Sequence, residues 1–159
     1  MSNIEEIGWK EWVALPSLGI PAIKAKIDTG ARTSALHTFR LEAFRSGNQD
    51  MVRFYVHPLQ TKTKIQIECI APVLDKRLVR DSGGHIEERY VINSDIVLGS
   101  RTWPIEITLT NRDDMLFRML LGRTAIIDGN FTVNPDKSYL TGKSLKSVYR
   151  KKWRNSGIK

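Results

Sequence analysis

The stretch that decides the fold is Ala22-Ile23-Lys24-Ala25-Lys26-Ile27-Asp28-Thr29-Gly30-Ala31. Its apolar alternation predicts a strand that ends in Asp28. Gly30 then lets the backbone turn and a ligand approach closely, while the Thr29 hydroxyl can hydrogen-bond the neighbouring backbone. The triplet alone is a weak signal, because the same residues also make ordinary turns. After such a strand it predicts a carboxylate held in place, which is a candidate catalytic group.

The rest of the composition is that of an ordinary globular protein. The chain has 159 residues, of which 41% are hydrophobic and 26% are charged. This length suits one domain with its own core. No apolar run approaches the roughly 20 residues of a membrane span, and the charged N-terminus does not resemble a signal peptide. Cys69 is the single cysteine. We therefore expect a cytoplasmic protein with a reduced thiol and no membrane partner.

The positive charge is concentrated at the C-terminal end. The chain has 25 basic and 17 acidic residues, a net charge of +8. Eight of the basic residues and none of the acidic ones lie from Lys137 onward, so residues 1–136 are neutral. We divide the chain into a domain over 1–142 and a basic tail over 143–159. Such a tail favours a polyanionic partner, for example a ribosomal component, RNA or an acidic protein, and its alternative is a solvated end.

Period-two patterns predict an all-β protein. Apolar residues alternate with polar ones over 52–56, 65–69 and 103–109, and residues 86–92 are rich in strand-forming types. Glycine and asparagine turns separate these runs, which is typical of an antiparallel sandwich or barrel. One short helix is expected over 123–127, after Gly122 and before Asp128-Gly129. The basic stretch 143–154 is expected to form another helix only if it docks.

Two further segments carry a resemblance to retropepsins. Met119-Leu120-Leu121-Gly122-Arg123-Thr124 resembles their second signature, in which the glycine lets a strand pass beneath the aspartate turn. Residues 83–90, Gly-Gly-His-Ile-Glu-Glu-Arg-Tyr, resemble the descending arm of the flap hairpin. With the Asp28 stretch, these segments are similar to a bacterial family of small retropepsin-like aspartic peptidases. That family is also labelled ATP-dependent zinc protease and is associated with ATP-grasp glutamate ligases.

The resemblance implies a fold, an activity and a set of site residues. The fold would be a retropepsin-like closed barrel. The activity would be hydrolysis of peptides, in glutamate-rich or glutamate-modified protein tails such as that of a ribosomal protein. The implied roles are Asp28 as the catalytic residue, Thr29 and Gly30 as the active-site turn, and Ala31, Arg32, Gly83, Gly84 and Arg123 as substrate-binding residues.

The chemistry needs a second carboxylate. Two carboxylates held close share one proton, so that one acts as the base on a water and the other as the acid. Asp81-Ser82-Gly83 is the rival triplet, but Arg80 precedes it and no second Leu-Leu-Gly-Arg segment follows, so we interpret it as the flap tip. The second carboxylate is then expected from a second copy of Asp28 in a homodimer. Residues 131–133 and 138–140 are candidate terminal strands for that pairing.

Arg32 departs from the viral pattern, which has an aspartate at this position paired with the later arginine. Arg32 and Arg123 would be like charges, and a buried like pair is costly. Two solutions remain open from the sequence. An internal acid such as Asp113 or Asp114 neutralises them, or substrate carboxylates do, since arginine suits bidentate carboxylate binding.

The zinc and ATP labels have little basis in the residues. His37, His57 and His85 show no metal-ligand spacing, one cysteine cannot make a structural zinc cluster, and no phosphate-binding Gly-x-x-x-x-Gly-Lys loop is present. We expect no metal and no cofactor. The alternative to the peptidase is a non-catalytic binding module of the same fold for a ribosomal, RNA or acidic protein partner.

Overall fold

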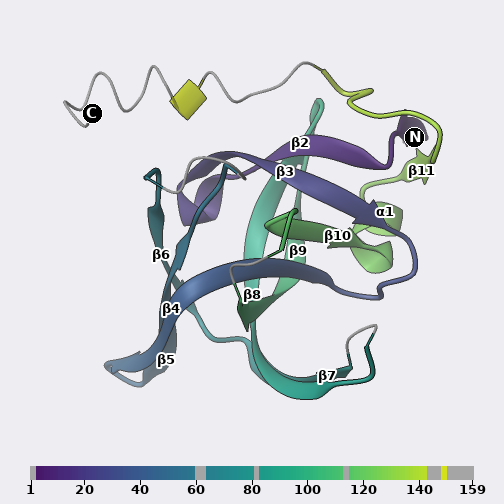
Figure 1. Cartoon of the computed structure of the whole chain (residues 1–159). Coiled ribbons are helices and arrows are strands. Elements are labelled where there is room, and N and C mark those ends of the chain that lie inside the picture. Colours follow the sequence, from purple (N-terminus) through teal and green to yellow (C-terminus); the bar gives the residue numbers. More distant parts are fainter. Residues whose placement is uncertain (1–2, 60–63, 81–82, 113–114, 143–147, 150–159) are drawn as a thin grey trace.

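The computed structural model (Figure 1) describes residues 3–59, 64–80, 83–112, 115–142 and 148–149. Strands dominate it, and none of the helices within these residues is long and apolar enough to span a membrane. In chain order the elements are β1 (Glu5–Ile7), β2 (Lys10–Leu15), the 3-10 helix η1 (Pro16–Leu18), β3 (Ile20–Asp28), β4 (Ser34–Ser46), β5 (Gln49–Val56), β6 (Ile67–Pro72), β7 (Asp75–Arg80), β8 (Ile86–Leu98), β9 (Arg101–Asn111), β10 (Met119–Gly122), α1 (Arg123–Asp128) and β11 (Phe131–Val133).

One large sheet curls around the core. Its described strands follow the order β10-β3-β2-β8-β9-β4-β5-β6, with β7 paired to β8. β10 pairs with β3 at the start of this order and also with β4 further along it, so the strands from β10 to β4 form a closed ring of pairings. The expected all-β, retropepsin-like fold with a short helix after Gly122 is confirmed. Its form is a strongly curled sheet rather than a regular barrel, since β2 and β8 share only one residue pair, Ala14 with Val97.

The core lies inside this curl, as the alternating patterns predict. In β5, Val52, Phe54 and Val56 are fully buried, and their neighbours are more exposed. The strands expected over 52–56, 86–92 and 103–109 form within β5, β8 and β9, and the run at 65–69 forms β6 from Ile67 onward. Packing of these apolar faces is the main source of stability in such a fold.

The first and the last strand of the described residues form a separate two-stranded sheet. β1 pairs with β11 in parallel, Glu5 opposite Phe131. Residues 138–140 do not form the expected strand, although the Tyr139 amide donates to the Lys10 carbonyl at 3.0 Å. The reason is a buried carboxylate, Glu11, which binds the next two residues instead. Its oxygens accept hydrogen bonds from the amides of Leu140 (2.9 Å) and Thr141 (3.2 Å).

The C-terminal segment contacts the domain again at Tyr149. This side chain is 1% exposed and packs with Trp12, Ala22 and Leu59. Its hydroxyl donates to the Ala22 carbonyl and accepts a hydrogen bond from the Ala22 amide at 3.2 Å. Val148 and Tyr149 are helical; the rest of the expected helix over 143–154 lies outside the described residues. The boundary at residue 142 stays a prediction, and Tyr149 lies beyond it.

Candidate active site

Asp28 ends β3, and its carboxylate is fixed by the turn that follows. The Oδ1 atom accepts a hydrogen bond from the Gly30 amide at 3.0 Å, and the Asp28 carbonyl accepts one from the Ala31 amide at 3.3 Å. Asp28 is half-buried, whereas Thr29 and Gly30 are exposed. Within the described residues the carboxylate makes no ion pair, and the cleft lining begins at Gly30, two residues after Asp28.

Strand β10 supports this turn from below. It runs parallel to β3, with Gly122 opposite Asp28. A Cβ atom at Gly122 would lie 2.6 Å from the Thr33 carbonyl carbon and 3.0 Å from the Ala31 oxygen, both backbone atoms, so only glycine fits. The Gly122 amide donates to Ser34 Oγ at 3.0 Å. The passage of a glycine strand beneath the aspartate turn is therefore present.

A cleft of about 1030 Å³ opens beside the turn. One wall is the loop that follows Asp28, and another is β7, which with β8 forms the expected flap hairpin. Figure 1 shows β7 curving toward the end of the molecule where α1 lies. The lining comes from residues 30–34 of the loop, 77–80 of β7, Asn93, residues 104–106 and 108 of β9, and Thr124, Ala125 and Asp128 of α1.

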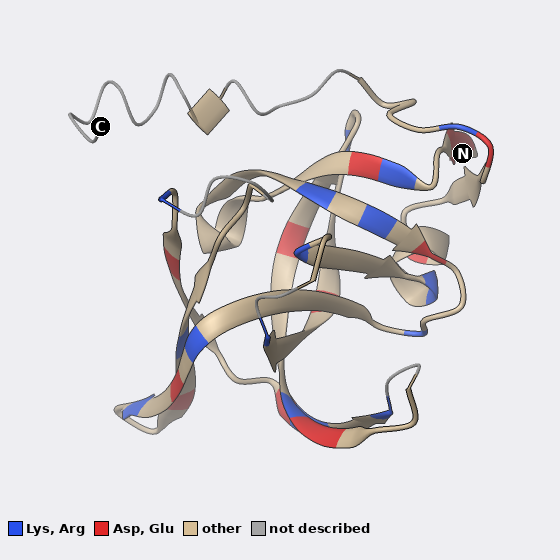
Figure 2. Cartoon of the chain, in the orientation of Figure 1, with Lys and Arg blue, Asp and Glu red and all other residues tan. Residues whose placement is uncertain are grey.

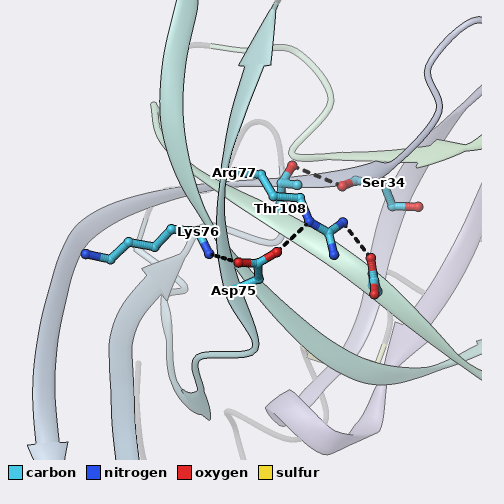
Figure 3. A network of polar contacts seen from close by, with 6 residues as sticks. Ser34, Asp75, Lys76, Arg77 and Thr108 are labelled. Carbon is cyan, nitrogen blue, oxygen red and sulfur yellow. Dashed lines mark hydrogen bonds and ion pairs between the residues drawn. The ribbon is translucent and has the colours of Figure 1, made fainter.

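Arg77 connects the flap to the body of the sheet. Its Nε donates to Asp75 at 2.9 Å, and its Nη1 donates to Glu106 of β9 at 2.7 Å (Figure 3). The bond from Arg77, followed by that from the Lys76 amide, lowers the pKa of Asp75. Nearby, the Thr108 hydroxyl donates to the Ser34 carbonyl at 3.1 Å and joins β9 to the loop after Asp28. The flap and the turn after Asp28 are thus both tied to β9.

The structure places the expected site residues in different environments. Ala31 and Arg32 line the cleft, with Arg32 exposed. Gly83 and Gly84 lie exposed before β8, outside the cleft lining. Arg123 is also outside the lining, and its Nη1 donates to the Thr29 carbonyl at 3.0 Å, which fixes the turn.

Most of the lining residues were missed from the sequence, among them Ser34, Arg77 and Arg80. The Ser34 hydroxyl accepts a hydrogen bond from the Gly122 amide. Arg77 and Arg80 line the cleft from β7. Ser34 follows Asp28 closely in sequence, and an inspection of small polar residues near the turn would have found it. The arginines belong to a charged strand without apolar alternation, so no local pattern marks them.

The cleft has an excess of positive charge. It is lined by Arg32, Arg77 and Arg80 and by the carboxylates of Glu106 and Asp128, and Arg77 is paired with Glu106. Among the described residues, the Arg32 and Arg80 side chains have no hydrogen bond or ion pair. Arg32 and Arg123 are both exposed, so the costly buried pair of like charges does not form. Asp113 and Asp114, the candidate internal acids, lie outside the described residues.

The histidines do not make a zinc site. Nowhere in the described ranges do three His, Cys, Asp or Glu side chains gather as a metal-binding group. His37 is buried and bonded to Thr110 at 2.6 Å, His57 stacks on Phe39, and His85 lies exposed beside the flap. Burial raises the pKa of the Cys69 thiol to about 12, which removes a thiolate ligand at neutral pH. These residues do not fit the zinc label. The rival Asp81 lies outside the described residues.

Curated relatives match most of this chain, but the chain spans only about a third of their length. A "Probable alpha-L-glutamate ligase" of Shewanella halifaxensis is 47% identical over 136 residues, which are 86% of this chain and 30% of the relative. A relative with the same name in Parasynechococcus marenigrum is 48% identical, over 86% of this chain and 29% of the relative. Another, in Desulfotalea psychrophila, is 42% identical, over 96% of this chain and 34% of the relative.

A solved structure and a family model match as well. Lpg0085 of Legionella pneumophila, described as a protein of unknown function, superposes with a TM-score of 0.73 at 29% identity, covering 88% of this chain and 99% of that protein. Residues 6–144 match the RimB-like family model, "Retropepsin-like aspartic endopeptidase RimB". That range includes the Asp28 turn, the flap, Gly122 and α1. The chain belongs to the RimB-like family of retropepsin-like aspartic endopeptidases.

Proposed function

We propose that this protein is a homodimeric aspartic peptidase in which Asp28 of each copy supplies one of the two catalytic carboxylates. The observation that carries the proposal is the position of Asp28. It is a half-buried carboxylate, oriented by the Gly30 amide, and it lies next to a cleft that is bordered by a flap. The described part of the chain brings no second carboxylate into hydrogen bond with it, so a second copy is the natural source.

The two carboxylates would act as an acid and a base. At close range they cannot both ionise, so they hold one proton between them. The ionised Asp28 takes a proton from a bound water, which attacks the peptide carbonyl, while the protonated Asp28 donates its proton to the carbonyl oxygen. Thr29 and Gly30 hold the geometry, and Arg123 supports it through the Thr29 carbonyl.

Exposed apolar side chains around the cleft support assembly with a second copy. Leu78 of β7 is 75% exposed, Ile127 of α1 is 66% exposed and Ile86 of β8 is 55% exposed. A second copy that brings its own Asp28 to this end of the molecule would cover such side chains, and their burial would stabilise the dimer.

The charge of the cleft favours an acidic peptide as the substrate. Arg32 and Arg80 face it without described ionic partners, and arginine binds carboxylates in a bidentate manner. The longer relatives are named as glutamate ligases, which fits a substrate that contains glutamate. Ala31 and Arg32 would contact the substrate from the loop, and Gly83 and Gly84 from the flap. The reduced, buried Cys69 fits a cytoplasmic location.

The first test is hydrolysis of a glutamate-rich peptide by the variant Asp28→Asn. The amide has the same shape but cannot act as a base, so we expect the variant to fold and dimerise and its hydrolysis to fall at least about 1,000-fold. Asp128→Asn is the matched control, because Asp128 is another carboxylate of the cleft and should be dispensable.

Two results would contradict the proposal. One is full activity in Asp28→Asn, and the other is loss of activity in Asp81→Asn with Asp28→Asn unaffected, which would assign the catalytic role to the rival triplet. If neither the wild-type protein nor any variant hydrolyses peptides, the non-catalytic binding module becomes the better account.

A further inference from the structure

The outer face of the β2–β3 hairpin carries a group of lysines. Lys10 of β2 lies opposite Lys26 of β3, and Trp12 lies opposite Lys24, so all four side chains project from the same side. Lys26 is exposed, and Lys10 and Lys24 are half-buried. Figure 2 shows these basic positions as blue bands on the two neighbouring strands. We name this the lysine face.

Aromatic rings lie between these lysines. Lys10 Nζ is 4.7 Å from the centre of the Trp9 ring and 5.2 Å from that of Tyr139. Lys24 Nζ is 5.5 Å from the Trp12 ring and 5.9 Å from the Tyr139 ring. Trp9 is 37% exposed at the edge of the face. Ammonium groups therefore lie beside aromatic rings on one surface, where Trp9 is exposed, Tyr139 is half-buried and Trp12 is buried.

The acid within β2 does not neutralise this face. Glu11 points to the opposite side of the strand and is fully buried. Its two oxygens accept hydrogen bonds from the amides of Gly8, Leu140 and Thr141 and from the Thr141 hydroxyl. Its charge is thus directed at backbone dipoles inside the protein.

The C-terminal segment is attached to the same hairpin. Tyr149 packs on Trp12 and binds both backbone groups of Ala22 in β3. The sequence around Tyr149 belongs to the stretch from Lys137 onward that has eight basic residues and no acidic one. Tyr149, which lies within this basic stretch of the sequence, is therefore anchored on the hairpin that bears the lysine face.

We propose that the lysine face binds single-stranded RNA. A nucleotide strand offers two things at each step, a phosphate for an ammonium group and a base that stacks on an aromatic ring. An acidic polypeptide would use the lysines but leave Trp9 and Tyr139 unused. The cleft, in contrast, has arginines that suit carboxylates. The two surfaces thus differ in chemistry, and this proposal does not depend on the peptidase.

The test is fluorescence anisotropy of a labelled 12-nucleotide oligouridylate with the full chain across a salt series. We expect the wild-type protein to bind and the triple variant Lys10→Gln/Lys24→Gln/Lys26→Gln to bind at least about 10-fold more weakly. Its slope of log K against log salt should be smaller by about 2, since each single-strand phosphate contact contributes about 0.7. Lys76→Gln is the matched control, because Lys76 belongs to β7, away from the lysine face, and its Nζ also lies near an aromatic ring, 5.2 Å from the centre of Tyr90 in β8.

Trp9→Leu separates stacking from charge. It should weaken RNA binding about 5-fold or more and leave the salt slope unchanged, because a base–ring contact is worth about 1–3 kcal/mol. If the triple variant fails to fold, the single change of the exposed Lys26→Gln should still reduce the slope by about 0.7.

Three results would overturn the proposal. They are no binding by the wild-type protein, equal binding and slope in the triple variant and the wild-type protein, and displacement of the RNA by polyglutamate that Trp9→Leu does not affect. The last result would assign the face to an acidic protein.

Discussion

At the residue scale, the candidate site depends on how closely two backbone segments approach. Gly122 of β10 lies against the backbone of Thr33 and Ala31, and the Arg123 amide that follows donates to the Ala31 carbonyl at 2.7 Å. These contacts fix the loop after Asp28 from below. The position of the carboxylate therefore depends on the absence of a Cβ atom at Gly122, which lets the two backbone segments approach closely.

The variant Gly122→Ala should therefore be strongly destabilised. Its methyl group would lie 2.6 Å from backbone atoms of Thr33 that cannot move aside. Overpacking of this kind costs about 3 kcal/mol, and urea denaturation measures the loss. Leu116→Ala is the control, because Leu116 is 70% exposed in the segment before β10. That exposed substitution should change stability by less than about 0.5 kcal/mol. An alanine variant at Gly122 as stable as the wild-type protein would show that the contact is not tight.

At the element scale, the C-terminal segment is part of the domain's packing. The Tyr149 hydroxyl satisfies both backbone groups of Ala22, on a stretch of β3 that the short strand β10 does not cover. Glu11 holds the chain earlier, at Leu140 and Thr141. Removal of the chain after Gly142 would therefore expose Trp12 and leave Ala22 unpaired, in addition to its effect on charge.

Tyr149→Phe isolates the role of the hydroxyl. It keeps the ring but leaves a buried amide and carbonyl without partners, so we expect a loss of about 1–3 kcal/mol in the free energy of unfolding. Tyr139→Phe is the matched control. Burial also raises the pKa of Tyr149 above its ordinary 10.0, so the folded state holds this proton more tightly. Wild-type stability should then fall as pH rises above about 10, and less steeply in Tyr149→Phe. Equal stability of the two phenylalanine variants would contradict this role.

At the scale of the whole molecule, the sequence was informative wherever a local pattern has one physical cause. Apolar alternation predicted β5, β6 and β9, and a richness in strand-forming residues predicted β8. The segment between Gly122 and Asp128-Gly129 predicted α1. The 13-residue strand β4 was missed because residues 34–38 are buried on both faces and do not alternate. β7 was missed because it is an exposed, charged strand.

Contacts between residues far apart in the sequence could not be predicted from local sequence patterns. Glu11 and Thr141, or Ala22 and Tyr149, are about 130 residues apart, and neither member of a pair has a sequence signal. The same holds for the approach of Arg77 and Arg80 to the cleft, which depends on how the flap curves. The turn at Asp28 was predictable because its residues are consecutive.

The central claim is that one active site needs Asp28 from two chains, and mixed dimers test it most directly. Wild-type and Asp28→Asn chains are unfolded and refolded together in varied proportions at constant total concentration, and peptide hydrolysis is measured. If each site needs two Asp28 carboxylates, activity follows the square of the wild-type fraction, so an equal mixture retains about one quarter of the full activity. A linear dependence, with about one half retained at equal proportions, would mean that each chain acts alone and would contradict the account.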